Sequence, residues 1–167
     1  MKIGFNLFFI LLTIISGCAL RPMYKSPLES EKRAFLKIEY ESDEFMPVGR
    51  FDHLPEIIKC DQPEDQVSKL ALINKGGNPL LSNVNVDGVW IKAEEKFIIS
   101  STSIPANAGR VCSDWTSFTP RDKASYEAKL VQREEKCAVT ILEIVKQEDG
   151  SIVKIPVNDA KQETCIK

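Results

Sequence analysis

Apolar residues that alternate with polar ones, in short segments between turn-forming residues, constrain the fold of this chain most. In residues 34–40 (AFLKIEY), every second side chain is apolar or aromatic, and the charged Lys37 and Glu39 fall between them. This alternation predicts a half-buried β-strand. Similar β-rich segments recur as far as residue 157, with Gly, Pro, Asn and Asp between them. Many short strands and at most one helix predict a mainly β chain that folds as a single β-sandwich-like domain.

The clearest local element is a β-hairpin near the C-terminus. Residues 137–146 and 152–157 are rich in β-branched side chains and flank a run of turn-forming residues, 147–151 (QEDGS). Residues 119–135, just before the hairpin, are ambiguous. They begin with Thr-Pro, as many helices do, but their later apolar residues alternate with charged ones, as in a strand. We favour a loop followed by a strand.

The first 17 residues contain the only long apolar run of the chain. Lys2 precedes an almost wholly apolar stretch, residues 4–15, which ends in Ile15-Ser16-Gly17-Cys18. A basic residue, about a dozen apolar residues and small residues before a cleavage point are the pattern of a secretory signal peptide. A transmembrane helix would need about 20 apolar residues. The sequence therefore predicts a signal peptide over residues 1–17.

Ile15-Ser16-Gly17-Cys18 resembles the lipobox of bacterial lipoproteins. The resemblance implies cleavage before Cys18, a diacylglyceryl group on its sulfur and usually a third acyl chain, such as palmitate, on its new amine. Two or more chains hold a protein firmly on a membrane. Lipoproteins retained in the enterobacterial inner membrane usually have Asp in the next position, whereas this chain has Ala19. The resemblance therefore implies the outer membrane; we favour its periplasmic face, and display on the cell surface is the alternative. A plain cleaved signal peptide with a chance cysteine is the alternative.

The rest of the chain divides into a tether and a domain. Residues 18–32 contain two prolines, several charges and no apolar periodicity, so we expect a lipidated tether. Its 14 residues after Cys18 could extend to about 45 Å. Residues 33–167 would form the β-sandwich-like domain, because about 150 residues after the signal peptide suffice for one domain.

The remaining cysteines predict disulfides rather than a metal site. Four are left once Cys18 is assigned to lipid: Cys60, Cys112, Cys137 and Cys165. An even number in an exported chain predicts two disulfides, because the periplasm is oxidising. We favour Cys60–Cys112 and Cys137–Cys165, although the other two connectivities remain open. No CxxC pair is present and the chain has a single histidine, so we predict no metal site.

Composition favours a non-catalytic protein without a cofactor. Lys2 is the only charge in the signal peptide, so 21 of the 22 basic residues remain against 24 acidic ones, which argues against nucleic acid as a partner. A Ser–His or Cys–His nucleophile would have to use His53, which we interpret as a surface or loop histidine. No GxSxG motif is present. A pair of carboxylates far apart in sequence, as in glycosidases, keeps a hydrolase as the alternative.

The candidate binding residues are aromatic. Trp90, Trp115 and Phe118 could form a ligand-binding cluster on strands, although packing in the core is the more common role of such residues. We expect a lipid-anchored envelope protein that acts as a binding or structural module for a protein or cell-wall partner. An accessory subunit of an envelope or secretion machine is a further alternative.

A second resemblance concerns the middle of the chain. The order of Val86-Asp87-Gly88, an apolar strand, a turn between Pro105 and Gly109, and a strand with Cys112 resembles the PEGA-type β-sandwich modules of small lipoproteins. It covers about residues 84–145, less than half of the chain. Such modules share no catalytic residues, so the resemblance implies a β-sandwich and no reaction.

Overall fold

The computed structural model describes residues 21–42, 48–54, 67–75, 82–104, 112–133 and 136–163. These residues form strands and no helix, so no described helix is long and apolar enough to cross a membrane. The strands are β1 Arg33–Ser42, β2 Val48–Leu54, β3 Ser68–Asn74, β4 Val89–Lys92, β5 Phe97–Ile104, β6 Cys112–Phe118, β7 Ser125–Arg133, β8 Lys136–Lys146, β9 Ile152–Pro156 and β10 Lys161–Gln162.

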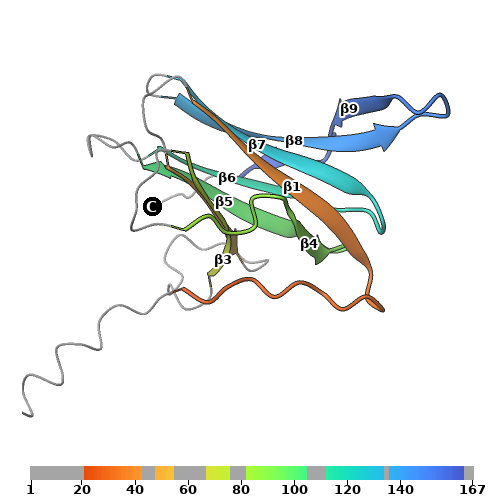
Figure 1. The fold of residues 1–167 in the computed structure, drawn as a ribbon, viewed down its shortest axis with the longest axis horizontal. Coiled ribbons are helices and arrows are strands. Elements are labelled where there is room, and N and C mark those ends of the chain that lie inside the picture. The colour runs from red at the N-terminus through yellow and green to blue at the C-terminus, as the bar shows by residue number, and fades with distance from the viewer. Residues whose placement is uncertain are drawn as a thin grey trace, which may run out of the picture.

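The strands form two five-stranded sheets that pack face to face (Figure 1). The first sheet has the order β4-β1-β7-β8-β9 and the second β10-β6-β5-β2-β3. The prediction of a mainly β chain is confirmed. The loop and strand that we favoured for residues 119–135 are also observed, since β7 occupies the second half of this segment. The predicted hairpin is β8 and β9, in which Lys146 pairs with Ile152.

A parallel pair lies at the centre of the first sheet. β1 runs parallel to β7, with Leu36 opposite Tyr126 and Tyr40 opposite Leu130, whereas the other strand pairs are antiparallel. A parallel pair needs a long connection, and here the chain builds β2 to β6 between its two partners. This crossover ties the two sheets together.

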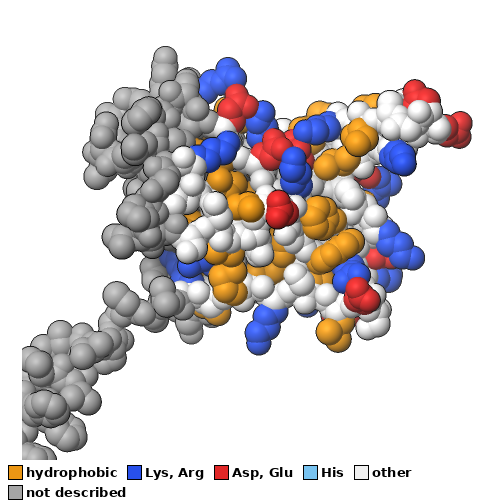
Figure 2. Space-filling view, viewed as in Figure 1, with side chains coloured by type: hydrophobic (Ala, Val, Ile, Leu, Met, Phe, Trp, Pro, Cys, Tyr) orange, Lys and Arg blue, Asp and Glu red, His pale blue; other side chains and the backbone are white. Residues whose placement is uncertain are grey.

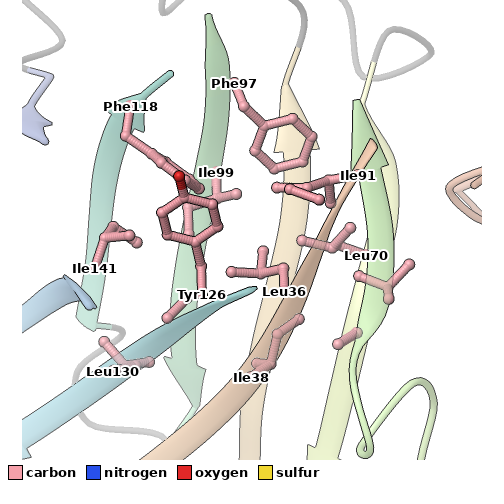
Figure 3. Close-up of a cluster of buried hydrophobic side chains, with 14 of the residues drawn as sticks. Leu36, Ile38, Leu70, Ile91, Phe97, Ile99, Phe118, Tyr126, Leu130 and Ile141 are labelled. Carbon is pink, nitrogen blue, oxygen red and sulfur yellow. The ribbon is translucent and has the colours of Figure 1, made fainter. Parts of the chain in front are cut away.

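The core lies between the sheets and follows the alternation of the strands. Figure 3 shows side chains from both sheets gathered in this core, among them Leu36 and Ile38 of β1, Leu130 of β7 and Ile99 of β5. Aromatic rings fill one end, where Phe118 packs against Phe97 and Tyr126 with ring centroids 6.1 and 5.2 Å apart. Edge-to-face pairs of this kind add about 0.5–1.5 kcal/mol beyond their buried area.

The segment expected to be a tether lies against the domain. The N–H of Lys69 in β3 donates to the carbonyl of Pro22 over 2.8 Å, and the N–H of Tyr24 donates to the carbonyl of Lys69 over 3.0 Å. The Tyr24 ring packs edge-on against Phe97 with centroids 6.0 Å apart, and Pro27 is buried. The domain therefore includes residues well before 33. The sequence did not predict this attachment, because only Tyr24 and Pro27 face inward. Two such residues among prolines and charged residues form no periodic apolar pattern.

The predicted disulfides and the lipid site fall mostly outside the described residues. Cys18, Cys60 and Cys165 lie outside them, and Cys112 is described only through its backbone in β6. Cys137 is the only one of these cysteines whose side chain is described, and it packs half-buried against the core. The predicted pairing of Cys60 with Cys112 and of Cys137 with Cys165 therefore stays a prediction.

Candidate functional site

The three aromatic residues predicted for binding do not form one cluster. Phe118 is 1% exposed and belongs to the core. Trp115 of β6 is half-buried in the second sheet, where its carbonyl accepts the N–H of Glu163 over 2.7 Å. Trp90 of β4 is 38% exposed at the edge of the first sheet. The prediction grouped these residues as aromatic side chains on strands. Trp115 and Phe118 are three positions apart in β6, and such positions face opposite sides of a sheet.

Trp90 is packed on two sides. Its ring contacts Phe35 edge-on, with centroids 5.3 Å apart, and the guanidinium of Arg33 lies 4.3 Å from its centroid. A cation over an indole face gives about 0.5–1 kcal/mol at an exposed site. This arrangement supports a structural role for Trp90 and leaves only part of the ring accessible to a ligand.

His53 is placed on β2, opposite Ser68 of β3 and Ile99 of β5. Its side chain lies outside what the structure describes. The described residues contain no group of three or more His, Cys, Asp or Glu side chains that could hold a metal ion.

A charged end of the sandwich is formed by the loop between β6 and β7, residues 119–124. Backbone hydrogen bonds hold this loop, since the N–H of Lys123 donates to the carbonyl of Arg33 and that of Glu94 to the carbonyl of Pro120. The carboxylate of Asp122 also accepts the N–H of Arg33 over 3.0 Å. Glu94 and Lys123 have φ angles of 64° and 60°, which non-glycine residues adopt at a steric cost.

Two open hollows meet at this charged end. One has a volume of about 420 Å³ and the other about 710 Å³, and both are lined by Asp122 and Lys123. Ion pairs cross the rims: Lys32 with Glu94, and Arg121 with Glu143. The hydrogen bond that the ammonium of Lys32 donates to the carboxylate of Glu94 raises the pKa of Lys32. The hollows are therefore lined by fixed charges, and they suit a polar surface rather than an apolar ligand.

The β8–β9 hairpin extends beyond the two-layer body (Figure 1). Four of the five β9 residues are exposed, including Ile152 at 67% and Ile155 at 46%. Positions three apart in a strand face opposite sides, so both faces of β9 present an uncovered isoleucine. The sequence contained a sign of this, because residues 152–157 (IVKIPV) are apolar at odd and even positions.

The hairpin is held rigidly despite its exposure. Its turn is closed by hydrogen bonds from the N–H of Gln147 to the carbonyl of Ser151 and from the N–H of Gly150 to the carbonyl of Gln147. The ammonium of Lys154 in β9 donates to both carboxylate oxygens of Glu127 in β7, over 2.9 and 2.7 Å. Glu127 is only 1% exposed. A buried carboxylate needs such a partner, so this contact fixes β9 to the body.

The free edge of β9 is poorly suited to adding another strand. The N–H of Val157 donates to the carbonyl of Ile141 in β8. In this antiparallel pair the odd-numbered residues of β9 therefore form backbone hydrogen bonds with β8. The even-numbered residues Ile152, Lys154 and Pro156 direct their backbone groups toward the free edge. Pro156 has no N–H to donate, and prolines and lysines are common devices against edge pairing. A partner of this hairpin would therefore contact side chains rather than extend the sheet.

Hydrophobic, acidic and basic side chains are interleaved over the surface seen in Figure 2. The chain matches no family model, no curated protein and no solved structure. Its resemblances to lipobox sequences and to PEGA-type modules stay predictions from the sequence.

Proposed function

We propose that this chain is a lipid-anchored protein of the bacterial cell envelope that binds a protein partner without catalysing a reaction. In this proposal Cys18 carries the lipid, in the outer membrane on its periplasmic side. The observation that carries the binding role is the β8–β9 hairpin, which exposes Ile152 and Ile155 on its two faces. These two exposed apolar side chains on one projecting hairpin offer a partner contact area on either face of β9.

The chemistry around the hairpin favours a protein over a small ligand. Glu143 of β8 lines the larger hollow and connects it to the hairpin, with Arg121 and Lys123 across the rim. An apolar centre with a charged rim is the usual anatomy of a protein interface. Because Lys154 already fixes the hairpin to Glu127, little conformational entropy would be lost on binding.

Site-specific photo-crosslinking in intact cells tests the binding role. A photoreactive residue at Ile155 should give one reproducible crosslinked species, because this side chain would lie in the interface. The matched control is Thr140, which is exposed on β8 away from the hairpin tip. The crosslink should disappear with Ile152→Asp, an exposed substitution that leaves folding intact. Equal crosslinking at Thr140, or crosslinking unaffected by Ile152→Asp, would contradict the proposal.

The anchor has its own test. Cys18→Ser should abolish incorporation of labelled palmitate and leave an unprocessed or soluble form, as measured by intact mass and membrane fractionation. Ser16→Ala is the control, because it preserves a small residue before the cleavage point. A Cys18→Ser protein that is still lipid-labelled and membrane-bound would refute the lipid attachment.

We also propose two disulfides, with a pairing that differs from the one favoured by the sequence. The N–H of Val139 in β8 donates to the carboxylate of Asp114 in β6 over 2.7 Å. Four residues farther along β6, Phe118 contacts Tyr126 of β7, and Tyr126 pairs with Glu143, which is four residues farther along β8. The two strands therefore run in the same direction across the sandwich.

This register supports a bridge between β6 and β8. Cys112 lies two residues before Asp114, and Cys137 lies two residues before Val139. Because residues two apart in a strand share a face, the two cysteines fall at matching positions on β6 and β8. We therefore propose Cys112–Cys137, which leaves Cys60 and Cys165 as the second pair.

Peptide mapping without reduction distinguishes the connectivities, because trypsin places the cysteines on separate peptides. Residues 111–121 should be found linked to 137–146, and 60–69 to 162–167. A link between 60–69 and 111–121 would instead support the pairing that the sequence favoured. Reduction before digestion should release all four peptides and serves as the control.

A further inference from the structure

Contacts between the described N-terminal segment and the domain begin close to the proposed lipid site. The backbone of Pro22 and Tyr24 is bonded to Lys69 at the edge of β3, and Met23 forms a parallel bridge with the same residue. Tyr24 and Pro27 face inward and fix the segment that follows. The chain therefore joins the domain at Pro22.

The remaining tether is short. Four residue steps separate Cys18 from Pro22, so even a fully extended chain spans only about 13–14 Å. A headgroup layer is about 5–7 Å thick on each side of the hydrocarbon core. A domain held by a lipid on Cys18 is therefore confined to the membrane surface, instead of standing about 45 Å above it as a 14-residue tether would allow.

The outer side of this segment has the chemistry of a membrane-contacting surface. Met23 is 43% exposed and Leu28 is 70% exposed. Residues 21–28 contain Arg21 and Lys25 and no acidic side chain, and Lys25 is exposed. Apolar side chains beside basic ones bind the interface of bilayers that contain anionic lipids.

We infer that residues 22–28 lie on the membrane, with Met23 and Leu28 among anionic lipid headgroups, and that the β8–β9 hairpin points away from it. This inference rests on the proposed lipidation of Cys18. In Figure 1 the segment before β1, red to orange, runs along the lower side of the body from left to right, whereas the β8–β9 hairpin projects at the upper right. The short tether thus leaves the hairpin accessible to a partner in the periplasm.

Hydrogen exchange of the lipidated full chain tests this orientation. The protein is produced in a bacterium that processes lipoproteins and is reconstituted in nanodiscs of phosphatidylethanolamine and phosphatidylglycerol, and its lipid is verified by intact mass. The matched control carries a 15-residue Gly-Ser spacer between Ala19 and Leu20. Exchange over residues 22–28 should be at least about threefold slower in the direct form than in the spacer form. Residues 147–157 should exchange equally in both.

A second variant separates lipid contact from tether length. Lys25→Glu with Leu28→Asp changes two exposed side chains, so folding should persist while exchange over residues 22–28 rises to the spacer level. Equal exchange in the direct and spacer forms, or slowing at the hairpin, would overturn the orientation and leave the anchor intact. Absence of the lipid mass would refute the anchor, and the orientation would fall with it.

Discussion

At the scale of single residues, Gly88 is required where β4 approaches β1. Its φ of 114° is a conformation that other residues rarely adopt, and a Cβ there would lie 2.5 Å from Cζ of Phe35 and 2.8 Å from the carbonyl oxygen of Leu36. Gly150, in the hairpin turn, has a φ of 84°, and a Cβ there would meet nothing within 4 Å. The two glycines thus share a backbone conformation that would strain a residue with a Cβ, but they differ in the space around them.

Substitution by alanine should separate these two effects. Gly88→Ala should lower the free energy of unfolding by about 3 kcal/mol, because steric overlap adds to backbone strain. Gly150→Ala should lower it by only about 1 kcal/mol, from strain alone. Urea unfolding followed by tryptophan fluorescence measures both values, and equal losses would contradict the crowding at Gly88.

The contact between Lys154 and Glu127 should stabilise the fold. Lys154→Met would leave the buried carboxylate without its two hydrogen bonds, so the free energy of unfolding should fall by about 2 kcal/mol. Glu127→Gln combined with Lys154→Met should lose less than the sum of the single changes, as coupled residues do. Additive losses in a double-mutant cycle would show that the two side chains do not interact.

At the scale of elements, the carboxylate of Glu163 is one of the groups that hold the short strand β10 against its sheet. Glu163 accepts a hydrogen bond from Ser117 over 2.6 Å and pairs with Lys96 over 2.7 Å. Hydrogen bonds from Lys96 and then from Ser117 lower its pKa below the usual value of 4.5. The pKa of Glu163 is lower in the folded than in the unfolded state, so its ionised carboxylate stabilises the fold. This stabilisation is fully present above the unfolded pKa and is lost as the pH falls through the folded pKa.

Acidification should therefore loosen β10 before the rest of the sheet. Amide exchange of residues 161–163, corrected for intrinsic rates, should accelerate below about pH 4.5 relative to exchange in β5. Lys96→Met should move this acceleration to higher pH, because the remaining hydrogen bond from Ser117 lowers the carboxyl pKa less. An acceleration at the same pH in both proteins would exclude Lys96 as the cause.

Local patterns predicted some elements and missed others for a physical reason. The β8–β9 hairpin could be predicted because its turn residues and β-branched arms act over neighbouring positions. The attachment of residues 22–27 could not, because it depends on Lys69 and Phe97, which are far along the chain. The separation of Trp90 from Trp115 likewise depends on which sheet each strand joins.

At the scale of the whole molecule, the parallel pair β1–β7 controls assembly. Phe35 pairs with Ser125, about 90 residues along the chain, so this contact requires closure of a long loop. Proteins dominated by such non-local pairs fold in milliseconds to seconds. Stopped-flow refolding should show its main phase in this range, and a microsecond phase that recovers the full native signal would contradict a rate-limiting closure.

The sequence by itself determined the strand-forming segments and the hairpin turn, since each depends on residues close together in the chain, and the signal peptide stays a prediction from the same kind of local pattern. Only the tertiary structure decided that β1 pairs with β7, that Glu127 is buried beneath Lys154 and that Pro22 already belongs to the body. These features arise from contacts between distant segments, whose free energy depends on the joint packing of two sheets. The alternation of apolar residues in one strand predicts which face of the strand is buried, but the opposing sheet determines which side chains pack against that face.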